Sequence, residues 1–405
     1  MALLSALPVE IIQQIATHLP VCTDLLHFSL SFRKAHDAIL ATQAVCRKLF
    51  LRSYDKPAEW EEYDYKRTYW LRQHVLGKFL DADGPPPGDC DPMPMRILDG
   101  VKDIMFEARA KNFPHLHRFA LRSTNFLPAF PDLTDPVPKL LMTLQLILTN
   151  IAASERVTWA NHSLEIINSQ RWAYGDGSRA LFEKGGIDGP DLTRLWRTAN
   201  FFLLHFDGLM GASDGGLKLS GLKFDFETVL GEGRGEPGAW ACLGEEEPVP
   251  RYWFGFYVYL EPADIHKLRA TSITTPLQDH YDGRLSIMKL DITDTTFTGS
   301  GSDIEPFTVK GAISPLPPIS SIPGWRRISF SNDYPEDRWL YEGCLLPGSK
   351  TIIGRWTTFD DDEIDDPGTS GWEGPFIMWA VSREDFEYEK EQRDGVISED
   401  DFLNH

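Results

Sequence analysis

The segment DTTFTGSGSDIEPFTVKGAI, residues 294–313, sets the fold expected for the C-terminal part of the chain. Two runs of aromatic, β-branched and small residues, at 294–300 and 306–313, flank residues 301–305, where Gly301, Ser302 and Asp303 favour a turn. Similar runs occur near residues 251–260, 268–273, 285–291, 325–331, 338–345, 350–358 and 374–381. Their turn-length connections and the lack of intervening helical patterns predict an antiparallel sandwich or closed barrel of about eight or nine strands.

The N-terminal residues have a different, helical periodicity. Pro8 suits the first turn of a helix, Pro20 ends that helix after Leu19, and Thr23 is placed to cap a second helix. A third helix is expected at about residues 36–51. Three such short helices bury little surface by themselves, so they need a neighbour, which is either the rest of this chain or another protein.

One run of N-terminal residues resembles an F-box, the helical module that docks on the Skp-type adaptor of a cullin–RING ubiquitin ligase. The run consists of Leu7-Pro8, Glu10-Ile11-Ile12, Ile15, Leu19, Asp24-Leu25-Leu26, Ser29-Leu30 and Arg33. The resemblance implies a Skp-type partner, and through it a cullin–RING ligase. The residues that it places against the Skp-type partner are Leu7, Pro8, Glu10, Ile11, Ile12, Ile15, Leu19, Leu25, Leu26 and Leu30.

A second resemblance concerns the predicted strands. Their ordered Gly and aromatic positions are similar to the β-domain that follows the F-box in many fungal F-box proteins, a domain that looks like a small calycin-type barrel. The matching segments are Trp253-Phe254-Gly255-Phe256-Tyr257, Phe297-Thr298-Gly299-Ser300-Gly301-Ser302-Asp303, Phe307-Thr308-Val309-Lys310-Gly311, Tyr341-Glu342-Gly343, Ile353-Gly354-Arg355-Trp356 and Gly374-Pro375-Phe376-Ile377-Met378-Trp379. Glycines inside strands relieve crowding where a closing barrel bends.

Aromatic residues of these strands are candidates for the inside of the barrel. They either pack together as a core or line a ligand cavity, since a barrel of about eight strands can do both. We expect packing, because aromatic stripes are usually core. The candidates are Trp253, Tyr257, Trp325, Trp339, Trp356 and Trp379.

These patterns divide the chain and predict an α+β fold: a three-helix N-terminal module, a mostly helical middle and a C-terminal antiparallel barrel. Helices in the middle are expected at 97–111, 137–153, 157–169 and 190–206. The predicted regions are an F-box at 1–52, a helix and Pro/Gly linker at 53–94, the middle at 95–240, the barrel at 250–382 and an acidic tail at 383–405.

Charge and cysteine content limit the function classes. The net charge of −20 opposes association with nucleic acid or anionic membranes. Residues 359–405 hold 16 acidic and 3 basic residues, and the loop predicted at 359–368 is acidic enough to select a basic segment of a partner. Five scattered cysteines without a CxxC pair, and the lack of a leader or a spanning segment, predict a soluble protein of the cytoplasm or nucleus.

Motifs for catalysis or metal binding are weak. GASDG at 211–215 matches a nucleophile elbow around Ser213, but a predicted helix precedes it where that motif needs a strand. His115 and His117 would share one face of a strand, without a third metal ligand at a diagnostic spacing. We therefore assign no catalytic residue, metal or cofactor.

The sequence thus predicts a non-enzymatic adaptor whose F-box holds a Skp-type protein while the barrel captures a protein substrate for ubiquitination. The alternatives are a small-molecule binder or enzyme that uses a barrel cavity, with Ser213 as the weak hydrolase candidate, and a structural protein whose first helices are ordinary core.

Overall fold

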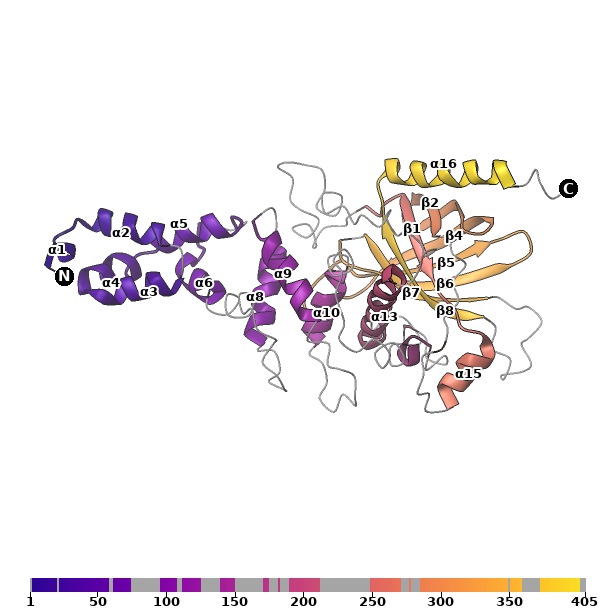
Figure 1. The fold of residues 1–405 in the computed structure, drawn as a ribbon, viewed down its shortest axis with the longest axis horizontal. Coiled ribbons are helices and arrows are strands. Elements are labelled where there is room, and N and C mark those ends of the chain that lie inside the picture. The colour runs from indigo at the N-terminus through magenta and orange to yellow at the C-terminus, as the bar shows by residue number, and fades with distance from the viewer. Residues whose placement is uncertain are drawn as a thin grey trace. The chain divides into compact units, whose positions relative to one another are not determined.

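The computed structural model describes residues 2–19, 22–57, 61–73, 95–107, 111–124, 139–149, 170–174, 181–182, 189–211, 248–270, 277, 285–348, 350–358 and 372–400. The chain forms two compact units. The first comprises Met1–Phe126 and Gly235–Ala241, and the second comprises Leu127–Arg234 and Cys242–His405. Figure 1 shows the helices of the first unit and the barrel of the second.

The described part of the first unit is helical. Its helices are α1 (Ala2–Ser5), α2 (Val9–His18), α3 (Cys22–Ser31), α4 (Arg33–Leu40), α5 (Ala44–Ser53), α6 (Tyr65–Leu71), α8 (Met95–Phe106) and α9 (Phe113–Thr124).

The single helix predicted at 36–51 is wrong, because α4 ends at Leu40 and α5 begins at Ala44. Buried residues on α4 end with Ile39, and those on α5 begin with Val45. A spacing of six residues does not return to the same face of a continuous helix, so the chain must turn to bury both sets.

Two polar connections join α5 and α6 to the helices that follow. The Asp55 carboxylate accepts hydrogen bonds from the backbone N–H groups of Lys111 (3.0 Å) and Asn112 (2.9 Å), and the Asn112 amide oxygen accepts from Asp55 N at 3.0 Å. The buried Arg72 guanidinium lies 2.8 Å from the Glu107 carboxylate. Burial raises the pKa of the Glu107 carboxyl, although Arg72 opposes that rise. The compact unit therefore extends beyond the first five helices to α9.

The second unit contains a closed antiparallel barrel of eight strands, which confirms the α+β class. Each strand pairs with its sequence neighbours, and β1 pairs with β8. The strands are β1 (Tyr252–Tyr257), β2 (Ser286–Thr293), β3 (Thr296–Ser302), β4 (Pro306–Pro315), β5 (Arg326–Asp333), β6 (Arg338–Leu345), β7 (Thr351–Thr358) and β8 (Glu373–Ala380).

The strand predicted at 268–273 is wrong over its described residues. Residues 268–270 close helix α15 (Pro262–Ala270). Pro262 at the first helical position and Asp264 in the first turn favour a helix at this point, and both signals precede the predicted strand.

Close strand contacts explain two of the glycines. A Cβ atom at Gly354 would lie 2.2 Å from the backbone oxygen of Glu342, and one at Gly299 would lie 2.2 Å from the backbone oxygen of Lys289. Such distances are far below van der Waals contact, so only glycine fits at these positions without displacing the neighbouring strand.

Helices α10 (Lys139–Ile147), α13 (Leu192–Gly211) and α16 (Arg383–Asp400) also belong to the second unit. The predictions at 137–153 and 190–206 thus coincide with α10 and α13, whereas 157–169 lies outside the described residues. The segment predicted as an acidic tail begins with α16, which runs beside the barrel in Figure 1. Its Phe386 ring lies 5.0 Å from the ring of Tyr252 on β1. None of the described helices is long and apolar enough to cross a membrane.

Candidate functional sites

Exposed apolar side chains are concentrated in the first three helices. Eleven large hydrophobic side chains are exposed in the described part of the chain, and five of these belong to residues 4–30. Their exposed fractions run from 39% to 64%, and Leu26 and Leu30 lie one turn apart on the same face of α3. We call Leu4, Val9, Ile11, Leu26 and Leu30 the N-terminal apolar set.

The structure separates the residues predicted to contact a Skp-type partner into three groups, which are buried, half-buried and exposed. Ile12 and Leu25 are 0% and 1% exposed, so we reassign these two residues from docking to the core of the helices. Leu7, Ile15 and Leu19 are half-buried. The exposed ones are Pro8, Glu10, Ile11, Leu26 and Leu30.

Sequence reasoning missed Leu4 and Val9 of the N-terminal apolar set. Leu4 lies on α1, a single turn that no periodicity predicts, and Val9 directly follows Pro8 at the start of α2. Their apolar character next to Leu7 was the available signal. Both residues lie outside the motif positions of the F-box resemblance.

Four of the six candidate barrel aromatics fill the interior. Trp253, Tyr257 and Trp356 belong to the buried core cluster, and Trp339 packs against it. The Trp339 and Trp356 rings stack with centroids 4.8 Å apart, and Tyr257 meets the two rings edge-on at 5.4 and 5.7 Å. These side chains therefore form part of a packed interior.

The other two candidates lie elsewhere. Met378 points into the barrel, so the next residue, Trp379, faces the outside and packs edge-on against Phe254 with ring centroids 6.4 Å apart. Trp325 precedes β5 and is buried, but it is not a member of the interior cluster. Neither residue therefore lines the interior of the barrel: strand alternation turns Trp379 outward, and Trp325 lies before the first residue of β5.

Of the residues considered for catalysis and metal binding, the structure describes the two histidines and does not place them on one face of a strand. Ser213 lies outside the described residues. His115 and His117 lie on helix α9, where two residues so spaced face different directions. His115 stacks on Tyr54 with ring centroids 4.8 Å apart. Within the described ranges, no group of three potential metal ligands occurs.

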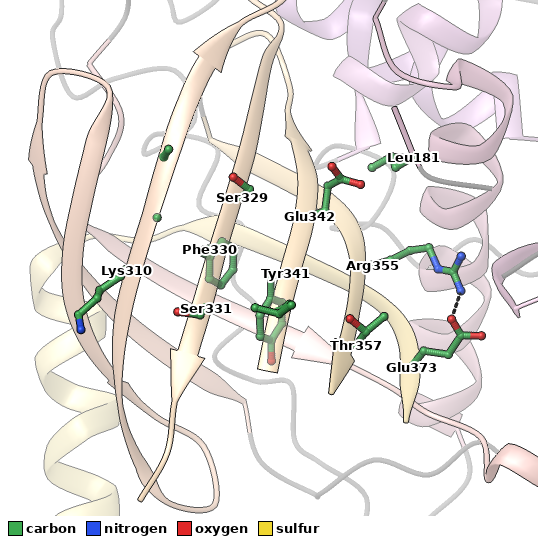
Figure 2. A pocket seen from close by; sticks show the side chains of 13 residues that line it. Leu181, Lys310, Ser329, Phe330, Ser331, Tyr341, Glu342, Arg355, Thr357 and Glu373 are labelled. Atoms are coloured by element: carbon green, nitrogen blue, oxygen red, sulfur yellow. Dashed lines mark hydrogen bonds and ion pairs between the residues drawn. The ribbon is translucent and has the colours of Figure 1, made fainter. Parts of the chain in front are cut away.

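A pocket of about 730 Å³ lies on the outer wall of the barrel over β4 to β8. Phe330 and Tyr341 point into the core, so the residues that alternate with them on β5 and β6 face outward. Strand register places the outward residues in two rows, as Figure 2 shows for most of them. This wall pocket is formed by Lys310, Ser331, Leu340, Thr357 and Glu373 in one row, Ala312, Ser329, Glu342 and Arg355 in the other, together with Leu181, Gly311, Phe330 and Tyr341.

Ion pairs hold the carboxylates of the wall pocket. Arg355 lies 2.7 Å from one carboxylate oxygen of Glu373, as Figure 2 shows, and Arg269 pairs with the other. Glu342 pairs with Arg327, whose guanidinium also lies over the Phe182 ring at 4.8 Å. These carboxylates are therefore already neutralised by neighbouring cations.

Comparison with known proteins gave no relative. No family model matches the chain, and no match was found among curated proteins or solved structures.

Proposed function

We propose that this protein is a substrate-recognition adaptor of a cullin–RING ubiquitin ligase. Its N-terminal helices dock a Skp-type protein, and the barrel unit captures the protein to be ubiquitinated. The adaptor contributes proximity, because tethering a target near the transfer site raises its effective concentration without a catalytic residue on this chain.

The observation that carries the proposal is the N-terminal apolar set. Contiguous exposed apolar patches mark interaction sites, and within the set Leu26 and Leu30 lie one turn apart on the same face of α3. Interfaces draw most of their binding energy from a few buried anchors, and Ile11 and Leu30 have the largest exposed fractions of the set, 44% and 64%. Their place within the F-box resemblance specifies the partner class.

The proposal places the protein in the cytoplasm or nucleus. The three described cysteines, Cys22, Cys46 and Cys344, carry no disulfide bond, which is consistent with a reducing compartment.

Binding to a purified Skp-type protein tests the proposal. The full chain, immobilised for biolayer interferometry, is compared with the double variant Ile11→Glu/Leu30→Glu. We expect the variant to bind at least about tenfold more weakly, because two charges would be buried without partners. The matched control is Ile304→Glu, which changes an exposed apolar residue of the barrel unit that is 56% exposed.

Circular dichroism establishes that both variants retain their fold. Absence of binding by the unmodified chain, or equal binding by the double variant, would refute the adaptor proposal.

A further inference from the structure

Closure of the barrel restricts how it can hold a peptide. All eight strands are paired on both sides, so this sheet offers no free edge to which a target strand could add. A captured segment must then be recognised by side chains. Among the described residues, the wall pocket gathers outward side chains from several adjacent strands in one hollow.

Three hydroxyl groups of the wall pocket can form hydrogen bonds with a ligand. Ser329 and Ser331 lie two residues apart on β5, and Thr357 lies on β7. Within the described part of the chain, none of the side-chain hydrogen bonds involves these three hydroxyls. Each is therefore available to donate to an acceptor on a ligand.

The charges around the wall pocket favour an anion. Glu373 contacts two guanidinium groups, and Glu342 contacts one. The Asp333 carboxylate beside the pocket accepts a hydrogen bond from Arg338 at 2.7 Å, while Lys310 Nζ is 3.9 Å away. Five cations therefore face three carboxylates here, in a chain whose net charge is −20.

Lys310 is the cation best placed to meet a ligand. Its side chain is 70% exposed, and its Nζ lies 3.9 Å from one Asp333 carboxylate oxygen, while Arg338 contacts the other oxygen at 2.7 Å. In strand register Lys310 lies directly beside Ser331. An ammonium group and a hydroxyl on neighbouring strands can bind one anionic group together.

An apolar residue continues the same row. Leu340 is 37% exposed and lies between Ser331 and Thr357. The row from Lys310 to Thr357 crosses three strand spacings, or about 14 Å, which is the length of about four extended residues. A site of this length with an apolar centre suits a peptide better than a free anion.

We infer that the wall pocket binds a short acidic peptide segment, with an anionic side chain at Lys310 and Ser331 and an apolar side chain on Leu340. The role of this site in target capture rests on the proposed adaptor function, whereas the binding itself does not. The anionic group is a carboxylate or a phosphate, which have the same recognition chemistry.

Fluorescence anisotropy with the full chain tests this inference. Three labelled ten-residue probes are used: alternating Glu and Leu, the same peptide with phosphoserine for Glu, and the same peptide with Lys for Glu. We expect the Glu or the phosphoserine probe to bind, with affinity falling as salt rises, and the Lys probe to bind at least tenfold more weakly. The stronger of the two anionic probes identifies the source of the anionic group.

Two variants and a matched control locate the binding. Lys310→Glu should lower the affinity for the anionic probe at least tenfold, and Leu340→Ser should lower that affinity several-fold. Lys390→Glu makes the same charge change at an exposed position of α16 and should leave affinity unchanged. Equal binding of the Lys probe, or equal effects of Lys310→Glu and Lys390→Glu, would overturn the inference.

The same assay separates this inference from the adaptor proposal. The Ile11→Glu/Leu30→Glu variant should bind the anionic probe as the unmodified chain does. Absence of Skp binding by the unmodified chain, together with intact anionic-peptide binding, refutes only the adaptor proposal. Intact Skp binding with no anionic-peptide binding refutes only the wall-pocket inference.

Discussion

The barrel and the first three helices differ in how far they bury their large apolar side chains. The barrel packs Trp253, Phe330 and Trp356 inside a closed sheet, whereas α1 to α3 leave the N-terminal apolar set exposed. A closed sheet encloses its apolar side chains, whereas short helices bury one set, such as Ile12 and Leu25, and leave another exposed. The difference lies in the exposed apolar surface of the helices, and this surface is the observation on which the adaptor proposal rests.

The largest expected effect separates the core of the barrel from the exposed helical surface. Trp356→Ala should destabilise the protein by about 3–5 kcal/mol, because a buried ring stacked on Trp339 is replaced by a cavity. Leu30→Ala, at a side chain that is 64% exposed, should change stability by less than about 0.5 kcal/mol. Denaturant unfolding monitored by fluorescence measures the change in the free energy of unfolding for both variants. Similar changes would contradict the difference in burial between the barrel and the helices.

Thiol reactivity tests whether the helices also possess an interior. Burial raises the pKa of Cys46 on α5 from 9.0 to about 11. Near pH 8 this lowers the reactive thiolate fraction about a hundredfold, and the fraction recovers as the pH rises toward 11. Alkylation with iodoacetamide, followed by peptide mass spectrometry, measures the rate at Cys46 in the native and urea-unfolded chain. Equally fast native and unfolded reactions would show that this interior opens readily.

A smaller effect is expected where α5 and α6 join the helices that follow. Asn112→Ala removes the acceptor for Asp55 N and the donor to the Ile104 carbonyl, which lies 3.2 Å away. Leaving these buried groups unpaired should cost about 2 kcal/mol. Urea unfolding measures the loss. A change below about 0.5 kcal/mol would mean that the first helices are stable without α8 and α9.

The smallest effect concerns a tight turn before β5. Ser320 and Ser321 have φ values of 53° and 64°. Residues other than Gly and Asn adopt such positive φ values only at a cost in free energy. Ser321→Gly should therefore stabilise the protein by up to about 1 kcal/mol. Ser314→Gly on β4, where φ is ordinary, should instead destabilise it slightly. Thermal melts of both variants compare them, and a lower Tm for Ser321→Gly contradicts the prediction.

Local patterns predicted the strands well because each barrel strand carries its own alternation. The run at 338–345 coincides with β6, since Trp339, Tyr341 and Leu345 alternate with outward residues and Gly343 fits the interior side. The exception at 268–273 arose because apolar residues near a helix end have no clear period over so short a length. Apolar content alone does not distinguish a strand from the last turn of a helix.

The wall pocket could not be predicted in the same way. Lys310, Leu340 and Thr357 lie on three different strands, and only the pairing register places them in one row. Their shared signal in the sequence is that each is separated by an odd number of residues from an inward aromatic on its own strand. Finding the row from that signal requires the strand order and register, which are properties of the folded sheet.

Pairing of β1 with β8 has a consequence for how the protein is made. Trp253 on β1 pairs with Ala380 on β8, so roughly 120 residues are synthesised after β1 before this partner strand is present. At ribosomal rates their synthesis takes about 6–24 s. During that interval Trp253 and Phe254 are exposed on a nascent chain with an unpaired edge. The barrel can therefore close only after β8 has been synthesised, so aggregation of the exposed first strand competes with folding during translation.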